Sequence, residues 1–254
     1  MYRTKTGGLI NRKKVLNFSF NGKNLKGFEG DTLSSALLGN GIHLVGRSFK
    51  YHRPRGIFTS GSEEPSALVQ LDEKKFTEPN IRATTVKLFD GLVANSQNHF
   101  GSLSWDFMRI NDYLSSFLSA GFYYKTFMWP KAFWEKVYEP IIRNAAGLGK
   151  LSKEPDPSIY DKGFLHCDLL VIGAGPSGLY SALIAARTGA KVIIVDEDFT
   201  LGGSLNGEKL EINGGLCTDW LGTILSELTS FKNVRLMPKT TLYGSFDHGI
   251  YGAL

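Results

Sequence analysis

Cysteine is scarce in this sequence of 254 residues, which has Cys167 and Cys217 alone. Two thiols so far apart are too few for a disulfide framework, a four-ligand zinc site or an iron–sulfur cluster site. The histidines lack metal-ligand spacing, and the cysteines lack the C-x-x-C spacing of a redox pair. We therefore expect no iron–sulfur cluster, no metal site and no reactive thiol.

Long apolar runs are missing as well. No stretch reaches the roughly 18 consecutive apolar residues of a membrane-spanning helix, and the basic start is not followed by the apolar core of a signal peptide. Hydrophobic residues make up 42% and charged residues 21% of the chain, which is typical of globular proteins. The sequence predicts a globular, cytoplasmic protein with no membrane partner.

Acidic residues are rare in the first part of the chain. Residues 1–60 carry eleven Lys and Arg against two Asp and Glu, and the densest basic segment is Arg47–Arg55. Such a field attracts phosphate groups, nucleic acid or an acidic partner surface. We favour a loop that faces a cofactor phosphate or a partner protein over a solvated loop, and we expect no nucleic acid partner.

A β-hairpin is predicted near the N-terminus. Residues 15–20 alternate apolar and polar side chains, and residues 23–28 supply a second short strand. Between them lies Asn21-Gly22, a pair typical of two-residue hairpin turns. The two segments are therefore expected to pair in an antiparallel way.

A short helix should follow the hairpin. The apolar residues of Leu33–Leu38 have the spacing of one helix face, with Asp31 as the predicted N-cap and Gly39-Asn40-Gly41 as the end. With a later strand at Ala67–Leu71, this order indicates an α+β domain, namely a β-grasp domain of the ferredoxin type. Plant-type ferredoxins hold their cluster through C-x4-C-x2-C spacing, and this region has no cysteine. A ferredoxin-like fold without a cluster is the expectation.

The middle of the chain is rich in aromatic residues, which we interpret mainly as core. Residues 108–118 and 131–146 are predicted helices, bent or broken by Pro130 and Pro140.

A polar segment with two prolines, residues 153–158, predicts a linker. We expect a ferredoxin-like domain over 1–100, an aromatic-rich helical connector over 101–160, and a nucleotide-binding domain over 161–254.

The strongest motif lies in the last part. Residues 168–172 form an apolar run that ends at a G-x-G-x-x-G turn, and an amphipathic helix pattern, an apolar strand at 192–195 and Asp196 follow. This order is typical of an α/β dinucleotide-binding domain of the Rossmann type. The helix start presents free N–H groups to a pyrophosphate.

Each residue of the motif has a predicted role. Gly173 makes the tight turn, Gly175 lets the backbone approach the pyrophosphate, and Gly178 lets the helix pack against the strand. Asp196 can accept hydrogen bonds from the adenosine ribose, and it would repel a 2′-phosphate. NAD or FAD is therefore favoured over NADP.

The segment after Asp196 indicates which class of dinucleotide-binding protein this is. Gly202-Gly203-Ser204 matches the glycine pair of flavoproteins that have two dinucleotide-binding domains.

Only 88 residues remain from Cys167 onward, too few for both halves of a doubly wound domain. A strand pair is expected around 234–237 and 240–243, with no late helix or return strand. We predict a fragment of a longer protein, truncated within this domain.

Several longer motifs resemble one known family. The sequence is similar to the N-terminal region of the alpha subunits of heterotetrameric sarcosine oxidases along essentially its whole length. The motifs that carry the resemblance are Gly30–Leu33, Ala36–Leu38, Gly46–Gly56, Gly61–Pro65, Ser96–Asn98, Ala120–Phe127, Ile142–Gly149 and the glycine-rich run at 173.

The resemblance implies a function and partners. Such subunits bind NAD, share an FMN with the beta subunit, which also holds FAD, and assemble with gamma and delta subunits. The complete enzyme oxidatively demethylates sarcosine to glycine with O2, giving H2O2 and, with tetrahydrofolate, 5,10-methylenetetrahydrofolate. The folate-binding part is absent from this chain, which is expected to be inactive alone. The alternative is a stand-alone dinucleotide-binding or electron-transfer module of a related amine or opine dehydrogenase complex.

The resemblance also assigns roles to single residues, none of them catalytic. Ser177 would donate its backbone N–H to the pyrophosphate, Glu197 and Asp198 would lie beside the adenosine, and Ser204 would approach a phosphate or ribose oxygen. Leu242 would contact adenine through its backbone. The predicted cofactor-binding residues are Gly173, Ala174, Gly175, Pro176, Ser177, Gly178, Asp196, Glu197, Asp198, Gly203, Ser204 and Leu242.

Overall fold

The computed structural model describes residues 2–73, 76–118, 120–121, 129–145, 149, 151–155 and 158–254. The chain forms two compact units, residues 1–157 and residues 158–254, and each is described by itself. The finer division into segments 1–100, 101–160 and 161–254 stays a prediction.

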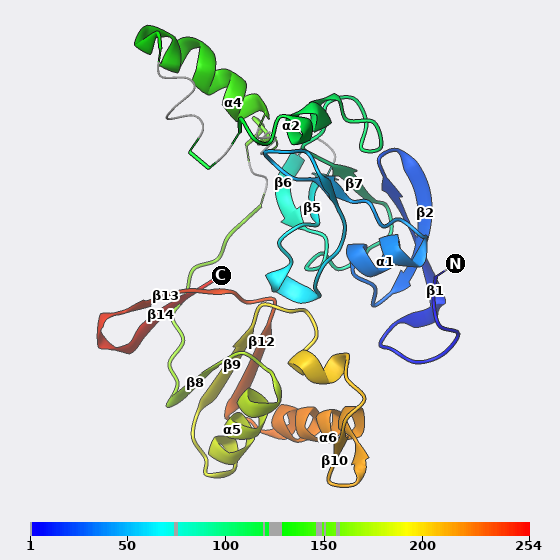
Figure 1. Cartoon of the computed structure of the whole chain (residues 1–254). Helices are drawn as coiled ribbons and strands as arrows, with labels where there is room; N and C mark the ends of the chain where they lie inside the picture. Colours follow the sequence, from blue (N-terminus) through cyan, green and yellow to red (C-terminus); the bar gives the residue numbers. More distant parts are fainter. Residues whose placement is uncertain are drawn as a thin grey trace. The chain divides into compact units, whose positions relative to one another are not determined.

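The first unit is built on a five-stranded mixed sheet (Figure 1). Its strands are β1 (Asn11–Phe20), β2 (Lys23–Glu29), β5 (Leu68–Glu73), β6 (Phe76–Arg82) and β7 (Leu92–Ser96), in the order β2-β1-β7-β5-β6. The β7 strand pairs parallel with β1 and antiparallel with β5. The predicted hairpin is confirmed, because β1 and β2 pair around Asn21 and Gly22, which both have positive φ.

The helix α1 (Leu33–Gly39) packs on one face of this sheet. Leu33 and Leu37 are fully buried against Phe18 and Leu92 of the strands. The predicted cap was wrong by one residue, because Thr32 accepts the N–H of Ser35 in a reciprocal capping box.

Asp31 binds other groups near the start of the helix instead. Its buried carboxylate accepts the backbone N–H of Phe28 and pairs with Arg3 at 2.7 Å. It therefore ties the N-terminal segment and the end of β2 to the start of the helix.

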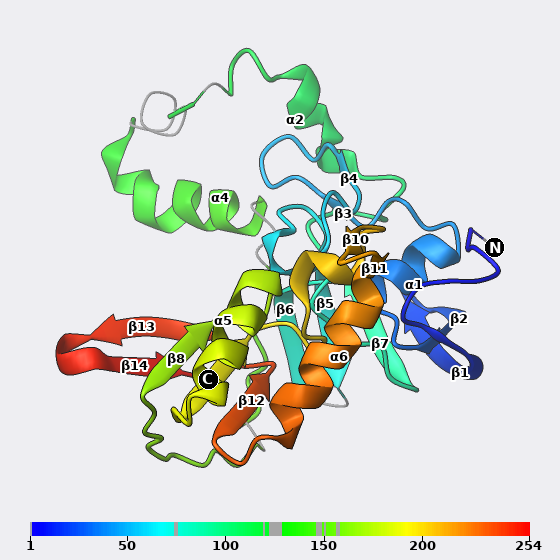
Figure 2. The same ribbon diagram turned by 90° about the horizontal axis from the view of Figure 1, so that it is seen from below.

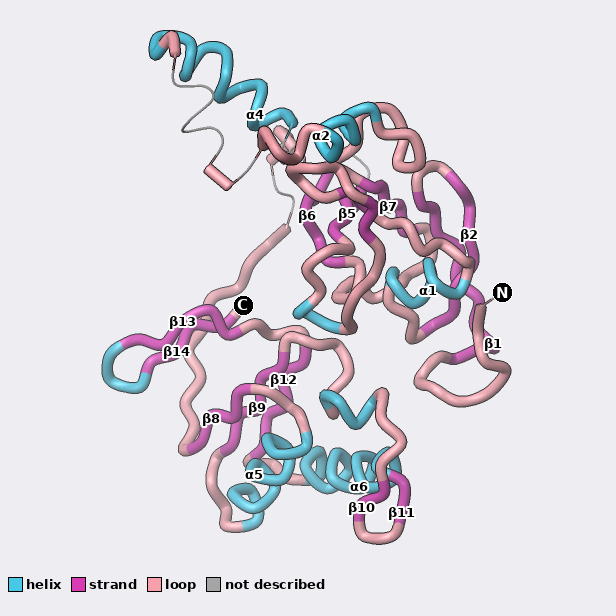
Figure 3. Tube along the Cα trace, in the orientation of Figure 1, coloured by secondary structure: helices cyan, strands magenta, loops and turns pink. Residues whose placement is uncertain are grey.

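The connection from α1 to β5 is mostly loop (Figure 3), with two-residue strands β3 (Gly46–Arg47) and β4 (Pro54–Arg55) and one turn of 3-10 helix, η1 (Gly61–Glu63). Arg47 is buried, and its guanidinium donates to the carbonyl groups of Leu103, Ser104 and His52. This cation of the predicted basic loop thus has a structural role.

Two further contacts fix the same loop to the segment after β7. The imidazole Nδ1 of buried His52 lies 2.6 Å from the carboxylate of Asp106. Arg53, which is half exposed, pairs with Asp112 at 2.7 Å. The loop is therefore held by residues about 55 positions away in sequence.

Helices after β7 are shorter than expected. Residues 107–113 form a short 3-10 and α-helical piece, η2 (Phe107–Arg109) and α2 (Ile110–Tyr113), where a helix over 108–118 was predicted. The helical turns end there because this segment has many exposed side chains and little packing to support a longer helix. The predicted motif residues 122–127 lie outside the described residues.

A second helical segment runs without interruption from Lys131 to Ala145, as η3 (Lys131–Phe133), the π-helical turn η4 (Trp134–Tyr138) and α4 (Glu139–Ala145). Pro140 lies inside it rather than breaking it. A π turn immediately before the proline changes the backbone pairing, so a residue without an N–H donor is tolerated. The last predicted residue of this helix, Ala146, lies outside the described residues.

The second unit holds a three-stranded parallel sheet of β8 (Leu169–Ile172), β9 (Val192–Asp196) and β12 (Val234–Pro238), in the order β12-β9-β8. Helices α5 (Pro176–Arg187) and α6 (Cys217–Ser230) lie side by side against it (Figure 2). Leu179, Ile194 and Leu228 are buried in the core between these layers.

Smaller elements complete this unit. They are the 3-10 turn η5 (Gly203–Asn206), the strand pair β10 (Glu211–Ile212) and β11 (Gly215–Leu216), and the hairpin β13 (Leu242–Phe246), η6 (Asp247–Gly249) and β14 (Ile250–Ala253).

The predicted pairing of 234–237 with 240–243 was wrong. The first segment joins β9 as the third parallel strand, and the second pairs with β14, a return strand that was not expected.

Among the residues that the structure describes, no helix is both long and apolar enough to cross a bilayer. The same described residues bring together no group of three His, Cys, Asp or Glu side chains that could hold a metal ion.

Candidate functional site

The turn between β8 and α5 has the backbone geometry that its glycines were predicted to allow. Gly173 has a φ of +94°, in the region that favours glycine. A Cβ on Gly178 would lie 2.0 Å from the carbonyl oxygen of Gly173, so the helix start packs directly on the turn. A Cβ on Gly175 would meet nothing within 4 Å. Open space therefore lies above Gly175, where a ligand could approach the backbone.

The start of α5 supplies N–H groups beside this space. Gly175 is the N-cap and Pro176 is the first helical residue, where its missing N–H costs nothing. Ser177 is exposed, and its N–H lies in the first turn, where a helix offers no acceptor of its own. A helix start of this kind is a favourable place for an anion such as a phosphate.

The carboxylate of Asp196 ties the turn to the end of β9. Its Oδ2 accepts the backbone N–H of Ala174 at 2.5 Å, and its Oδ1 accepts the backbone N–H of Asp198 at 2.8 Å. Each carboxylate oxygen keeps a further lone pair, so hydrogen bonds from a ribose hydroxyl remain available. Asp196 is thus partly used within the chain itself.

A cavity of about 310 Å³, the acidic pocket, opens at the carboxyl ends of β8 and β9. This volume lies at the low end of the range for small-molecule sites. The predicted residues Gly173, Asp196, Glu197, Asp198 and Leu242 line it. Its other lining residues are Ile172, Val195, Thr240 and Thr241.

The threonines were not among the predicted site residues. Thr240 donates its backbone N–H to the carbonyl of Asp196 at 2.8 Å, which holds the segment after β12 against the end of β9. The two threonines could have been predicted from the order of the parallel strands, because ligands of such sheets bind where adjacent strands end.

Three consecutive carboxylates give this pocket its electrostatic character. Burial raises the pKa of Asp198 above its ordinary value, and the negative charges of Asp196 and Glu197 raise it further. A field of this sign is unfavourable for a second phosphate at the ribose, while neutral hydroxyl groups can donate to it.

The glycine pair after Asp196 packs on the turn rather than on the pocket. Gly202 donates its N–H to the carbonyl of Ala174 at 2.9 Å, and a Cβ on Gly203 would lie 3.0 Å from the Cα of Gly175. Ser204 follows in η5 and is exposed. The predicted residues therefore form two adjoining sets: the acidic pocket, and the turn with its covering glycines.

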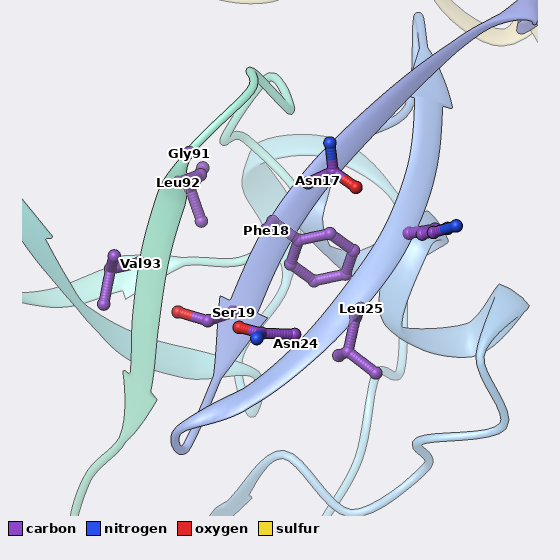
Figure 4. Close-up of a pocket in the computed structure, with 9 residues that line it drawn as sticks. Asn17, Phe18, Ser19, Asn24, Leu25, Gly91, Leu92 and Val93 are labelled. Carbon is purple, nitrogen blue, oxygen red and sulfur yellow. The ribbon is translucent and has the colours of Figure 1, made fainter.

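A second hollow lies on the first unit, with a volume of about 440 Å³ (Figure 4). Residues of β1, β2 and the start of β7 line it, among them Asn17, Phe18, Leu25 and Val93. Lys26 is its one titratable lining residue, and no pair of groups for acid–base or nucleophilic chemistry meets there. The acidic pocket is therefore the candidate site.

Two family models match parts of the chain. One, described as "2Fe-2S iron-sulfur cluster binding domain", matches residues 13–99. The other, described as "FAD dependent oxidoreductase", matches residues 168–231, which include the glycine turn and Asp196. The chain is thus a mixed α/β protein with a ferredoxin-type domain and an oxidoreductase domain.

The first match contradicts the cofactor prediction, which named NAD, FMN and FAD and excluded an iron–sulfur cluster. That prediction was wrong, because it set aside cluster binding for a segment that matches a cluster-binding family. Iron of such clusters is held by cysteine thiolates, and both cysteines of the sequence lie outside residues 13–99. The residues present do not fit that ligand set.

Curated relatives match along almost the entire chain. The alpha subunit of sarcosine oxidase from Rhizobium meliloti is 54% identical over 253 residues, covering 100% of this chain and 26% of the relative. The alpha subunit of sarcosine oxidase from Corynebacterium sp. strain U-96 is 33% identical over 247 residues, covering 95% of this chain and 20% of the relative. The chain therefore spans about a quarter or less of the length of these relatives.

A solved structure shares the fold. The crystal structure of L-proline dehydrogenase from P. horikoshii superposes with a TM-score of 0.59, covering 97% of this chain and 36% of the other, at 22% identity. At that identity, the likeness supports the fold alone.

Proposed function

We propose that this chain, a homologue of sarcosine oxidase alpha subunits along its whole length, is the part of such a subunit that binds an adenine dinucleotide. One arrangement carries the proposal: the open glycine turn, the start of α5 and the Asp196 carboxylate adjoin one pocket at the ends of parallel strands. The chain's own residues would bind and orient the cofactor.

The strand order supports a Rossmann-like interpretation of the second unit. Three parallel strands in the order β12-β9-β8, with α5 and α6 as the connections, correspond to half of a doubly wound domain. The ligand of that fold lies across the ends of the strands, beside the first glycine turn. The acidic pocket has this position.

The pocket favours a dinucleotide without a 2′-phosphate. Asp196, Glu197 and Asp198 would place up to three negative charges near the adenosine ribose, which disfavours NADP. NAD is the dinucleotide that we predict from the sequence, and the family match names FAD. When bound, either would supply hydride transfer, while Gly175, Ser177 and Asp196 would hold its pyrophosphate and ribose.

The activity of the whole enzyme is proposed from the relatives. The chain would contribute to the oxidation of sarcosine, since its relatives are alpha subunits of sarcosine oxidases. As the family resemblance implies, the reaction would give glycine with O2, in a complex with beta, gamma and delta subunits in the cytoplasm. Tetrahydrofolate would take up the released carbon to give 5,10-methylenetetrahydrofolate. The chain has no predicted catalytic residue, so the chemistry is assigned to other parts of the assembly.

Calorimetric titration of the full chain with NAD, FAD and NADP tests the binding function. We expect saturable binding of NAD or FAD with a stoichiometry near one, and NADP binding at least tenfold weaker because of the carboxylates. Equal affinity for NADP, or no binding of any dinucleotide by the folded chain, would contradict the proposal.

The enzyme function needs a separate experiment. Coexpression with a candidate beta subunit, followed by gel filtration and a sarcosine-dependent peroxide assay, should give a complex that forms peroxide. A complex that binds dinucleotide but forms no peroxide from sarcosine would reject the proposed reaction and leave the binding function intact.

A further inference from the structure

The first unit contains a buried carboxylate, that of Glu64, which is surrounded by backbone N–H groups. Glu64 lies just after η1 and is 0% exposed. Its Oε2 accepts the backbone N–H groups of Phe58 at 2.7 Å and Thr59 at 2.6 Å. Its Oε1 accepts the backbone N–H groups of Ser66 at 2.7 Å and Ala67 at 3.0 Å. The Glu64 side chain therefore joins the two ends of one loop, residues 58–59 and residues 66–67.

These four N–H groups form a nest for an anion. Burial by itself raises the pKa of Glu64, but the hydrogen bonds from the four backbone N–H groups outweigh it and hold the pKa below the ordinary value. The carboxylate is therefore charged at neutral pH. Backbone nests of this kind bind phosphates and iron–sulfur clusters in other proteins.

The spacing along the loop has a counterpart in cluster-binding ferredoxins. Thr59, Glu64 and Ala67 are separated by four and by two residues, the spacing of the first three thiolates in C-x4-C-x2-C. The segment also lies within residues 13–99, which match the cluster-binding family. The backbone amides of Thr59 and Ala67, and of their neighbours Phe58 and Ser66, are the ones that point at the Glu64 carboxylate.

Neighbouring side chains anchor the same loop from outside. Thr84 donates its hydroxyl to the carbonyl of Gly61 at 2.5 Å, and Arg82 donates to the carbonyl of Glu64 at 3.2 Å. The backbone of the loop is thus attached to the end of β6, and the nest keeps its shape around the buried carboxylate.

We propose that residues 58–67 form an anion-binding nest filled by the chain's own Glu64 carboxylate, and that this nest accepts a small free monocarboxylate once that side chain is shortened. The inference does not depend on dinucleotide binding, because the nest lies in the first unit and the acidic pocket in the second. The filled nest sets the shape of the loop between β4 and β5.

Chemical rescue tests this proposal. Glu64→Ala removes a group the size of acetate, and Glu63→Ala, at the exposed neighbouring glutamate, is the matched control. We expect Glu64→Ala to unfold at a lower temperature than the wild type and the control. Acetate, compared with chloride at equal ionic strength, should recover part of the loss in Glu64→Ala and shift the control no more than the wild type.

Glu64→Gln provides a second measurement if the alanine variant fails to fold. The glutamine fills the same volume, but its amide donor faces backbone donors. Hydrogen exchange in peptides that cover residues 57–69 should become roughly ten- to a hundredfold faster than in Glu63→Gln, because buried donors lose their acceptor. Acetate should not slow it, since the side chain still occupies the nest.

Three results would overturn the proposal. The first is equal melting temperatures for Glu64→Ala and Glu63→Ala, and the second is an acetate effect of equal size in all variants. The third is iron and sulfide bound stoichiometrically to the wild-type chain and lost on replacing Glu64, because a cluster and this carboxylate cannot share one nest.

Discussion

The backbone N–H of Ala174 donates a 2.5 Å hydrogen bond to Asp196 Oδ2, across 22 residues of sequence. The bond joins the glycine turn after β8 to the end of β9 without any bound molecule. A turn already held in place loses less conformational entropy when it binds a ligand. Asp196 therefore combines a structural contact with its predicted contact to ribose.

Gly175→Ala should weaken dinucleotide binding without unfolding the chain. A Cβ at Gly175 meets nothing within 4 Å and its φ is −71°, so alanine fits the protein alone. The methyl group would occupy the space above the turn and keep a phosphate away from its donors. Since a charged hydrogen bond contributes about 1.5–3 kcal/mol, we expect affinity in calorimetric titration to fall at least tenfold.

Gly222→Ala is the matched control for that variant. Gly222 also has open space around a Cβ, but it lies within α6, away from the turn. Alanine there should stabilise the helix by about 0.5–1 kcal/mol and leave affinity unchanged. Unchanged affinity in Gly175→Ala would mean that no phosphate approaches this turn.

Gly178→Ala should destabilise the second unit, in contrast with Gly222→Ala. Its Cβ would lie 2.0 Å from the carbonyl oxygen of Gly173 and 3.2 Å from Val171. The helix would have to move away from the strand, at a cost of roughly 1–3 kcal/mol in the free energy of unfolding. Urea unfolding followed by circular dichroism measures this cost. A variant as stable as Gly222→Ala would contradict the close packing of the helix start on the turn.

Asp198→Asn should change how stability depends on pH. The pKa of Asp198 is raised above its ordinary value of 3.8 by burial and by the charges of Asp196 and Glu197, so the folded chain holds this proton more tightly than the unfolded chain. Its contribution to stability is therefore present at low pH and is lost as pH rises from 3.8 through the raised pKa.

The asparagine variant removes that loss. We expect it to be more stable than the wild type at pH 7 by less than about 1 kcal/mol, because solvent screens a partly exposed group, and equally stable near pH 3. Urea unfolding across this pH range checks the sign, with Glu211→Gln as a control at an exposed site. A wild type that is favoured more strongly as pH rises would contradict the prediction.

Asp106→Ala should be the most destabilising of these variants. Its buried carboxylate accepts the N–H groups of Phe100 and Met108, and contacts His52 Nδ1 at 2.6 Å. Removing it takes this acceptor from two part-buried backbone N–H groups and this carboxylate contact from the buried His52 ring, with an expected cost of about 3–5 kcal/mol. Thermal unfolding of the first unit measures the effect.

Asp112→Ala is the comparison for Asp106→Ala. The Asp112 carboxylate pairs with Arg53, but both side chains are partly exposed, so its loss should cost less than about 1 kcal/mol. Similar losses in both variants would mean that burial of the His52 pair adds nothing to the stability of this loop.

Local signals made part of the fold predictable from the sequence. Asn21-Gly22 can adopt the positive φ of a two-residue turn, and the structure places the hairpin around it. The glycine turn at Gly173 likewise needs little beyond its own residues and the flanking apolar strands. In both cases the conformation depends on residues adjacent in sequence.

Other features depend on tertiary partners and could not be predicted in that way. The five residues Leu92–Ser96 have a weak pattern, but they form β7 because β1 and β5 flank them. The return strand β14 contains Gly252 and follows a turn at His248 and Gly249, so its composition suggests a loop. Thr32 rather than Asp31 caps α1 because Asp31 is already bonded to Arg3 and Phe28.

The same dependence limits what could be predicted of the site. The carboxylates of Asp196 and Asp198 were foreseeable from the motif, whereas Thr240 reaches the pocket only because β12 lies beside β9. Glu64 lies in the motif Gly61–Pro65, but its acceptor role could not be predicted from it, because that role depends on backbone donors that converge after folding.

The position of β7 in the sheet has a consequence for how the first unit folds during synthesis. It is the last strand of that sheet in sequence, yet it joins the β1–β2 and β5–β6 hairpins. Isolated two-stranded hairpins are marginally stable in water. On the ribosome, both should therefore stay exposed to proteases and chaperones until Ser96 has emerged, after which the sheet can close in a single late step.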